Sequence, residues 1–187
     1  MTPQSITARA HEWIAPALAP GAVAIDATAG TGADTAFLAT RVAPGGIVHA
    51  FDIQPAALER SRARLADQSV DAALCWHIAC HSTLSGVLGG SRAAAVMFNL
   101  GWLPGGDHRL ITRPETTCAA LEAAAAAIAP GGRISVVAYR GHPGGQDEYA
   151  AVAAWLQRGA HGLIVHDPLP ASASAVAPVL YRIAAPA

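Results

Sequence analysis

Apolar and polar positions alternate in blocks along this chain. Short apolar runs, typical of strands covered on both faces, recur between longer stretches with helical spacing. The expected strands cover residues 23–25, 47–51, 73–79, 93–98 and 133–139, and the expected helices cover residues 36–41, 55–66, a stretch up to 88, a stretch from 112 to 129 and the segment from Tyr149 to Trp155. Five such alternations predict a doubly wound α/β sheet with right-handed crossovers.

The two ends of the chain depart from this alternation. Residues 161–166 and 179–183 follow each other without a helix between them, which indicates an antiparallel hairpin. Residues 1–20 are typical of a short leading helix, with Pro3 at a tolerated first-turn position. A chain of 187 residues, 52% of them hydrophobic, is long enough for one well-buried domain. We therefore expect a single domain over residues 1–187, with its core in residues 21–187.

Several loops that contain glycine or polar residues each follow an expected strand. They are residues 26–32, Asp52, residues 80–82, residues 99–107 and residues 139–145. The carboxyl ends of parallel strands meet at one edge of a sheet, where α/β proteins bind their ligands. The topology therefore predicts that these five loops converge on one site.

The loop after the first strand has the composition of a nucleotide-binding turn. An apolar run ends at Asp26, passes through Gly30 and Gly32, and enters a helix. Glycine lets the backbone approach a ligand closely, and a helix N-terminus favours an anionic group. The second strand ends at Asp52, about the distance downstream at which dinucleotide folds place a ribose-binding acid.

A dinucleotide site fits this turn poorly. Thr35 occupies the third small position of the dinucleotide pattern, and a carboxylate at Asp26 gains nothing beside a pyrophosphate. S-adenosylmethionine carries an ammonium, a sulfonium and a ribose diol, so two acids flanking a glycine turn suit it better. The plainer interpretation is that Asp26 caps the turn and Asp52 caps the next helix. The expected cofactor-binding residues are Asp26, Thr28, Ala29, Gly30, Gly32, Asp34, Thr35, Asp52, Gln54, His81 and Ser82.

Composition and charge add few constraints. The net charge of -1 gives no overall electrostatic attraction to nucleic acid, although all 12 basic residues are arginine. Arg60, Arg62 and Arg64 cannot share one helix face and are expected to be a solvated surface. Three cysteines without a disulfide pattern, no long apolar run and no leader-like N-terminus predict a cytoplasmic protein without a membrane segment. The histidines lack metal-ligand spacing, and no metal is expected.

Longer motifs resemble one family. They are residues 26–35 (Asp26 to Thr35), residues 51–54, the Asn-Leu-Gly-Trp-Leu-Pro-Gly-Gly-Asp-His run at residues 99–108, residues 114–117 and the Gly-His-x-Gly-Gly run at residues 141–145. Together they resemble the YtqB-type class I methyltransferases, a family first labelled as rRNA methylases and now associated with the MnmM activity. The similarity extends from Ala24 to Ile183. It departs from the usual pattern at Cys80 and Arg140.

The resemblance implies a seven-stranded, mostly parallel sheet whose last strand is antiparallel. It also implies methyl transfer from S-adenosylmethionine to the amine of 5-aminomethyl-2-thiouridine at the wobble position of tRNA, in the anticodon loop. Such a transfer is an in-line displacement that depends mainly on alignment of the two partners.

Roles at the acceptor side follow from position and resemblance. Asn99, with the backbone of Leu100 and Gly101, is the expected hydrogen-bond acceptor that orients the amine, unless it only supports a turn. Trp102 is either a stacking platform for an unpaired base or a packing anchor. The other expected substrate contacts, to phosphate or amine, are Asp107, His108, Arg140 and His142, of which His108 or His142 could accept a proton.

Alternative functions stay open at this point. A small-molecule amine or oxygen methyltransferase accounts for the near-neutral charge, and a non-catalytic protein that binds S-adenosylmethionine accounts for the glycine turn. A nicotinamide oxidoreductase is disfavoured by Asp26. The oligomeric state is also open, with a homodimer as one option.

Overall fold

The computed structural model describes residues 4–103, 105, 110–159 and 162–187. Asp107 and His108, two of the expected substrate contacts, and His161, the first residue of an expected strand, lie outside the described residues.

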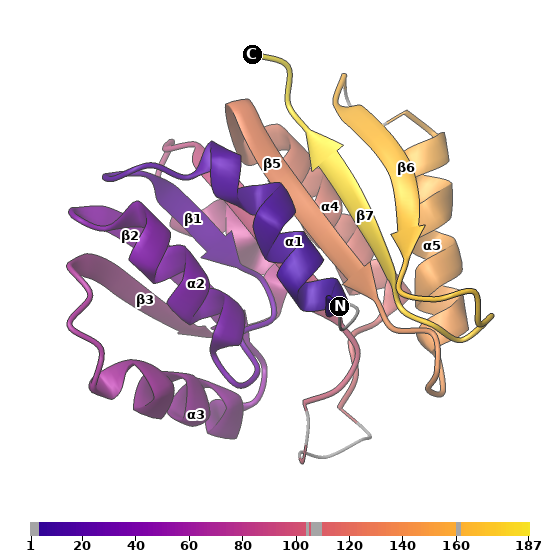
Figure 1. Cartoon of the computed structure of the whole chain (residues 1–187), viewed down its shortest axis with the longest axis horizontal. Coiled ribbons are helices and arrows are strands. Elements are labelled where there is room, and N and C mark those ends of the chain that lie inside the picture. Colours follow the sequence, from indigo (N-terminus) through magenta and orange to yellow (C-terminus); the bar gives the residue numbers. More distant parts are fainter. Residues whose placement is uncertain (1–3, 104, 106–109, 160–161) are drawn as a thin grey trace.

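A single seven-stranded sheet organises the described chain, in the order β3-β2-β1-β4-β5-β7-β6 (Figure 1). The strands are β1 (Val23–Asp26), β2 (Gly46–Asp52), β3 (Ala72–Ile78), β4 (Ala93–Leu100), β5 (Ile128–Ala138), β6 (Ile164–Pro170) and β7 (Val179–Ala184). β1 to β5 pair in parallel, whereas β7 is antiparallel to both β5 and β6. The predicted fold class and the predicted terminal hairpin are therefore confirmed.

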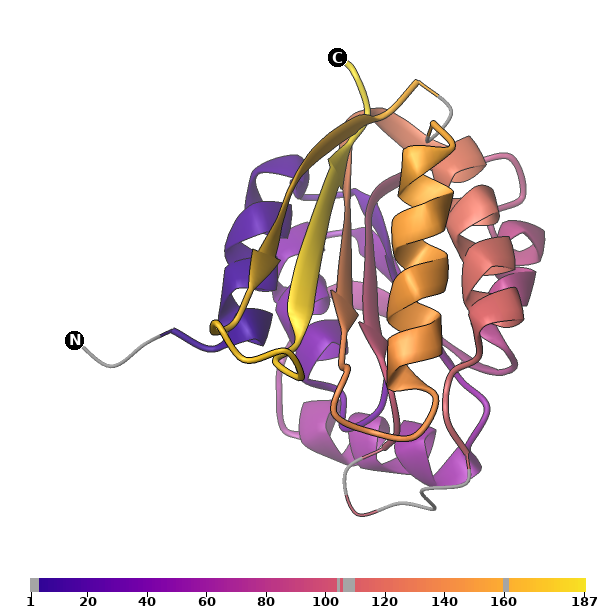
Figure 2. The same cartoon turned by 90° about the vertical axis from the view of Figure 1, so that its right-hand side faces the viewer.

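Helices cover both faces of the sheet. They are α1 (Ile6–Ile14), η1 (Ala15–Ala17), α2 (Ala33–Val42), α3 (Pro55–Ala66), η2 (His81–Val87), α4 (Pro114–Ala127) and α5 (Gly145–Gln157). Figure 2 shows α1 on one side of the sheet and α4 and α5 on the other. Successive residues of a strand point to opposite faces, so both faces of the central strands need apolar side chains.

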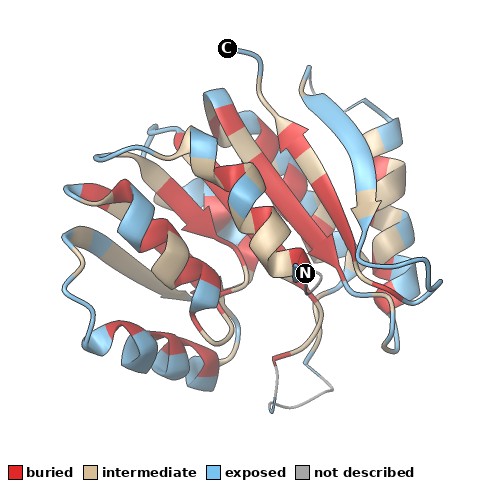
Figure 3. Ribbon diagram, viewed as in Figure 1, coloured by how far each residue is buried: buried red, intermediate tan, exposed pale blue. Residues whose placement is uncertain are grey.

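Two apolar cores result from this alternation. Ile25 and Phe98 belong to the core beneath η2, α4 and α5, whereas their neighbours Ala24 and Met97 belong to the core beneath α1 and α2. Figure 3 shows the central strands buried and the edge strand β6 largely exposed. The buried centre of the molecule is therefore the middle of the sheet, formed by β1, β4, β5 and β7. The loops of the predicted site lie at the carboxyl edge of this sheet.

The structure specifies three local elements more closely than the sequence does. The first helix begins at Ile6, where the Ser5 side chain accepts from Ala8 N, and Pro3, the expected first-turn residue, lies outside the described residues. The expected helix before residue 88 is a 3₁₀ helix. The Pro-Gly-Gly run at residues 130–132, a composition typical of a turn, lies inside β5, where the pairing with β4 shifts register between Ala93 and Ala95.

The Thr-Arg-Pro-Glu run at residues 112–115 has the spacing of a capping box but does not form one. Arg113 is the N-cap of α4 and makes no side-chain capping bond. The Thr112 hydroxyl instead donates to Glu148 Oε2 at 2.6 Å. A buried carboxylate on α5 attracts the hydroxyl more strongly than the exposed helix start does, because the hydrogen bond to a charged acceptor is the stronger one.

Candidate functional site

One cavity of about 700 Å³ opens at the carboxyl edge of the sheet. All five predicted loops contribute to it, and α1 adds Thr7. Its lining includes Thr7, Thr28, Ala29, Gly30, Asp34, Asp52, Ile53, Gln54, Cys80, His81, Asn99, Leu100, Gly101, Trp102, Leu110, Arg113, Tyr139, His142 and Val176. The predicted convergence of the loops is therefore confirmed.

Asp26 does not line this cavity. Its side chain is fully buried beneath the glycine turn, where Oδ1 accepts from Thr28 N at 3.1 Å and Oδ2 accepts from the Thr35 hydroxyl at 2.6 Å. Burial, and then the nearby charge of Asp34, raises the pKa of Asp26 to about 7, against the two hydrogen bonds that lower it. The expected direct contact of Asp26 with a ligand is therefore replaced by a role in holding the turn.

Asp52 does line the cavity. Its Oδ2 accepts from Gly30 N at 3.0 Å and its Oδ1 accepts from Gln54 N at 2.9 Å, so it ties the tip of β2 to the glycine turn. Burial raises its pKa, and the backbone N–H bonds oppose that shift. A carboxylate has about four acceptor positions, so Asp52 keeps acceptor capacity toward the cavity.

Three side chains form a polar chain from α1 to the cavity. His11 Nε2 lies 2.6 Å from Asp34 Oδ1, and Asn99 Nδ2 donates to Asp34 Oδ2. The Asn99 backbone N–H donates to the Thr28 hydroxyl at 2.7 Å. These contacts fix the Asn99 amide so that its nitrogen faces Asp34. Its oxygen is buried and has no hydrogen-bond partner among the described residues.

The loop after β4 is held by a buried carboxylate. Gly101 N donates to the Thr112 hydroxyl at 2.9 Å, and the hydroxyls of Thr112 and Thr117 each donate to Glu148 at 2.6 Å. Glu148 is 2% exposed, and burial raises its pKa although both threonine bonds lower it. Sequence reasoning missed Thr112, which has the spacing of a cap, and Glu148, which has the pattern of an ordinary first-turn acid.

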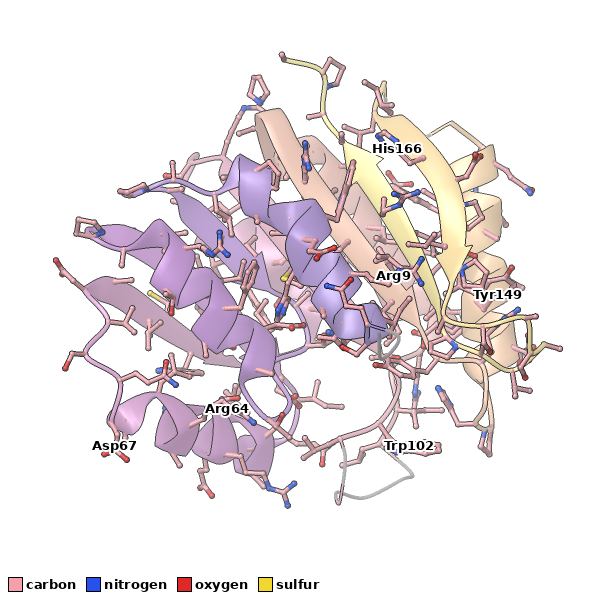
Figure 4. The ribbon with its side chains drawn as sticks, viewed as in Figure 1. Arg9, Arg64, Asp67, Trp102, Tyr149 and His166 are labelled. Atoms are coloured by element: carbon pink, nitrogen blue, oxygen red, sulfur yellow. The ribbon has the colours of Figure 1, made fainter. Side chains whose placement is uncertain are left out.

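Aromatic and apolar side chains surround the mouth of the cavity. The Trp102 and His142 rings lie 4.8 Å apart between centroids, and Figure 4 shows Trp102 on the loop below the sheet. His142 Nδ1 lies 2.9 Å from the Pro143 carbonyl oxygen. Leu110, Tyr139 and Val176, together with Ile53, are exposed hydrophobic residues in the same lining.

Other expected contacts lie outside the lining. Arg140 donates from Nε to Ala177 O at 2.7 Å and stacks over the Tyr149 ring, so it anchors the loop before β7. Gly32 packs on Ser61, and Thr35 is occupied by Asp26. Ser82 lies on η2 outside the lining, whereas its neighbour His81 is inside it. Burial lowers the pKa of His81, and its Nε2 is without a partner in the part of the chain that the structure describes.

The described residues contain neither a metal centre nor a membrane-spanning helix. No group of three or more His, Cys, Asp and Glu side chains in residues 4–103, 105, 110–159 and 162–187 is arranged to hold a metal ion. Within the same ranges, no helix has the length and apolar character needed to cross a membrane.

The sequence model of a protein family described as "Putative rRNA methylase" matches residues 48–163, which is more than half of the chain. The chain belongs to this family. Among its relatives, the Arabidopsis thaliana protein named tRNA (mnm(5)s(2)U34)-methyltransferase, chloroplastic, is 41% identical over 146 residues, or 72% of this chain and 53% of that protein. The chain thus spans about half the length of this relative.

Solved structures of similar rRNA-methylase-like proteins cover the whole fold. A protein from Clostridium thermocellum described as a "putative rRNA-methylase" is 34% identical with a TM-score of 0.90, over 98% of this chain and 99% of that one. A "putative methyltransferase" from Streptococcus mutans, solved in complex with SAH, is 28% identical with a TM-score of 0.84, over 97% and 98%. The class I methyltransferase fold is therefore established for this rRNA methylase family member.

Gly32 provides a test of how tightly the glycine turn is packed. Its φ of +80° disfavours any side chain, and a Cβ there would lie 2.7 Å from Ser61 Cα. We expect Gly32→Ala to lower the free energy of unfolding by about 2–4 kcal/mol, measured by urea denaturation. Gly21→Ala is the matched control, because Gly21 has a φ of +81° but nothing within 4 Å. Equal losses in the two variants would contradict close packing at Gly32.

The raised pKa of Asp26 predicts a pH dependence of stability. Between about pH 4 and pH 7 the folded state keeps a proton on Asp26 that the unfolded state has lost, so the contribution of Asp26 to stability falls as the pH rises. Asp26→Asn retains an oxygen that can accept from Thr28 N and removes this titration. The unfolding free energy of the variant relative to wild type should therefore increase from pH 4.5 to pH 7.5. A constant difference would count against the shifted pKa.

Proposed function

We propose that this chain is an S-adenosylmethionine-dependent N-methyltransferase that acts on the 5-aminomethyl group of 5-aminomethyl-2-thiouridine at the wobble position of tRNA. The observation that carries the proposal is the buried, unpartnered Asn99 Oδ1 in the same cavity as Asp52. The printed name of the Arabidopsis relative, and the SAH complex of the Streptococcus mutans protein, support the acceptor and the donor respectively.

The residues of the cavity fit the donor. Asp52 has acceptor capacity for a ribose diol, and the adjacent Ile53, 48% exposed, offers an apolar surface to an adenine ring. The backbone at Ala29 and Gly30 approaches the cavity without a bulky side chain. His81 also lines the cavity, and its Nε2, which has no partner among the described residues, can bond a polar edge of the adenine ring. When bound, the donor supplies a methyl carbon attached to a sulfonium, which departs as a neutral thioether.

Asn99 orients the acceptor amine. A carbonyl oxygen accepts one amine N–H and thereby directs the nitrogen lone pair, and Asp34 prevents the amide from turning its nitrogen into the cavity. His11 holds the other oxygen of Asp34. With the donor bound, the amine nitrogen held by Asn99 would take the methyl group, and the carbon–sulfur electron pair would stay on the departing thioether. Alignment supplies most of the rate enhancement.

His142 can take the proton that the methylated amine loses. A carbonyl oxygen only accepts, so the contact with Pro143 O requires the proton on Nδ1, and in the neutral ring Nε2 is then an acceptor. That atom has no partner within the described ranges, and the ring lines the cavity. The Trp102 ring beside it provides a stacking surface for a base, as aromatic residues do with unpaired RNA bases.

The three cysteines of the chain bear on its cellular location. Cys75, Cys80 and Cys118 are all free thiols, which suits a reducing compartment such as the cytoplasm, where tRNA is modified. A homodimer remains part of the proposal to be tested by the mass of the purified protein in solution.

Incubation with labelled donor and undermodified tRNA, followed by nucleoside mass analysis, tests the function. Label in 5-methylaminomethyl-2-thiouridine is the expected result. Label only in small amines would identify a small-molecule methyltransferase, and donor binding without transfer to any acceptor would identify a non-catalytic protein.

Asp52→Ala tests the donor site. Loss of a charged acceptor for two ribose hydroxyls should weaken binding of S-adenosylmethionine by about 100-fold, measured by isothermal titration calorimetry. Asp67→Ala is the control, because Asp67 is an exposed acid at the far end of α3. Unchanged affinity in Asp52→Ala, with the thermal melt preserved, would refute the assignment.

Asn99→Ala tests the acceptor site. Removal of the orienting oxygen should lower kcat by about 100-fold while the donor affinity stays within about threefold, measured in single-turnover assays with tRNA. Leu110→Ala, at an exposed position of the cavity lining, is the comparison variant and should affect KM more than kcat. A drop in donor affinity as large as the drop in kcat would mean that Asn99 belongs to the donor site instead.

A further inference from the structure

A second hollow, of about 240 Å³, lies on the face of the sheet covered by α1. It is lined by Gln4, Arg9, Glu12, Trp13, Arg133, Leu169 and Arg182, and we call it the arginine groove. None of these residues belongs to the lining of the larger cavity. Figure 4 shows Arg9 on α1, near the strands β5 and β7 that carry the other arginines.

The strand register explains why the basic side chains converge. Arg182 of β7 pairs with Ser135 of β5 on one side and with His166 of β6 on the other. Arg133 lies two residues before Ser135, so it points to the same face of the sheet. Arg9 comes from α1, which packs against β5 and β7 on this face. Three elements therefore bring three guanidinium groups, with His166 at the edge, around one side chain, Trp13.

Trp13 keeps these like charges together. The Arg133 guanidinium lies 4.4 Å and the Arg182 guanidinium 5.7 Å from a Trp13 ring centroid, and the His166 ring meets Trp13 edge-on at 4.7 Å. Cation–π attraction compensates part of the repulsion between neighbouring cations. It does not neutralise their charge, so the groove retains a positive potential.

No carboxylate neutralises the three arginines within the described residues. Their hydrogen bonds go to backbone carbonyl oxygens: Arg9 to Pro170 at 3.2 Å, Arg133 to Trp13 at 2.7 Å and Arg182 to Asp167 at 3.1 Å. Glu12 at the rim accepts from the Gln4 side chain at 2.6 Å. The groove thus holds three permanent positive charges against one negative charge.

Arg182 carries a further, independent indication of a ligand. Its Nε is buried and has no acceptor in the part of the chain that the structure describes. An unsatisfied buried donor costs about 1–3 kcal/mol, and more when it is charged. Since a guanidinium presents its N–H groups as a planar fork that matches phosphate oxygens, a phosphate that enters the groove and shifts the atoms covering Nε would satisfy this donor.

We propose that the arginine groove binds a backbone phosphate of the tRNA substrate. Thr7 lines the larger cavity and Arg9 lines the groove, so the two hollows flank the first turns of α1, a helix about 10 Å wide. A strand whose base enters the cavity can therefore cross α1 and place a nearby phosphate on Arg9 and Arg182. This inference rests on the proposed action on tRNA.

Salt-dependent binding of tRNA tests the groove. Each phosphate contact adds about one to the slope of log affinity against log salt concentration. Arg9→Gln and Arg182→Gln should each reduce that slope by about one and weaken tRNA binding by about three- to tenfold at 100 mM NaCl, measured by fluorescence anisotropy. At saturating tRNA, kcat should be unchanged, and so should the affinity for S-adenosylmethionine.

Two matched variants separate charge from fold. Arg158→Gln removes an exposed arginine at the end of α5 and should leave the slope as in wild type. Arg9→Lys keeps the charge and should retain most of the slope. Equal slopes for wild type, Arg9→Gln and Arg182→Gln would overturn the groove while the methylation of tRNA by wild type stands. Failure of the wild-type protein to bind tRNA would overturn both proposals. Inorganic phosphate titrated into wild type tests for a free-anion site. If it binds at millimolar concentration while the tRNA slope is the same in wild type and in both glutamine variants, the groove is a site for a free anion and the proposal is overturned.

Discussion

The carboxylate of Asp26, buried beneath the glycine turn, is the constraint on which the site depends. An unpaired carboxylate in such a place would be costly, and in this backbone conformation the two hydrogen bonds from Thr28 and Thr35 offset part of that cost. That conformation directs Gly30 N to Asp52, which joins the tips of β1 and β2. The cavity floor is thus a consequence of satisfying one buried acid.

From this floor the order extends to the acceptor side. Thr28 receives the backbone N–H of Asn99, so the same turn fixes the tip of β4. Asp34, in the first turn of the next helix, then orients the Asn99 amide and is itself held by His11 from α1. Donor and acceptor positions are therefore not built independently, because each takes its geometry from residues 26–35. A change in the turn should therefore affect both the donor side and the acceptor side of the proposed methyl transfer.

The sequence predicts the sheet and the converging loops because both follow from periodicity and topology, which are local or nearly local properties. It predicts Asp52 and Asn99 in the cavity because strand ends are readable. It does not predict that Asp26 faces inward, since a carboxylate followed by a turn looks the same whether it points at a ligand or beneath the backbone. No sequence pattern marks the pairing of His11 with Asp34, 23 residues away, or of Thr112 with Glu148, 36 residues away, so the roles of His11, Thr112 and Glu148 are not predicted. The hydrogen bond of Arg140 to Ala177, 37 residues further on, is equally unmarked in the sequence.

Net charge was a weak guide to nucleic-acid binding for a related physical reason. In physiological salt, exposed charges interact over only about 8 Å, so a phosphate responds to the few groups around it and not to the total of -1. Arg9 and Arg133 are 124 residues apart in sequence, and Arg133 and Arg182 are 49 apart. Only the register of β5, β7 and β6 and the packing of α1 on these strands make them neighbours. On the proposed function, a small domain holds RNA without a basic composition because its fold gathers a few arginines and leaves them without carboxylate partners.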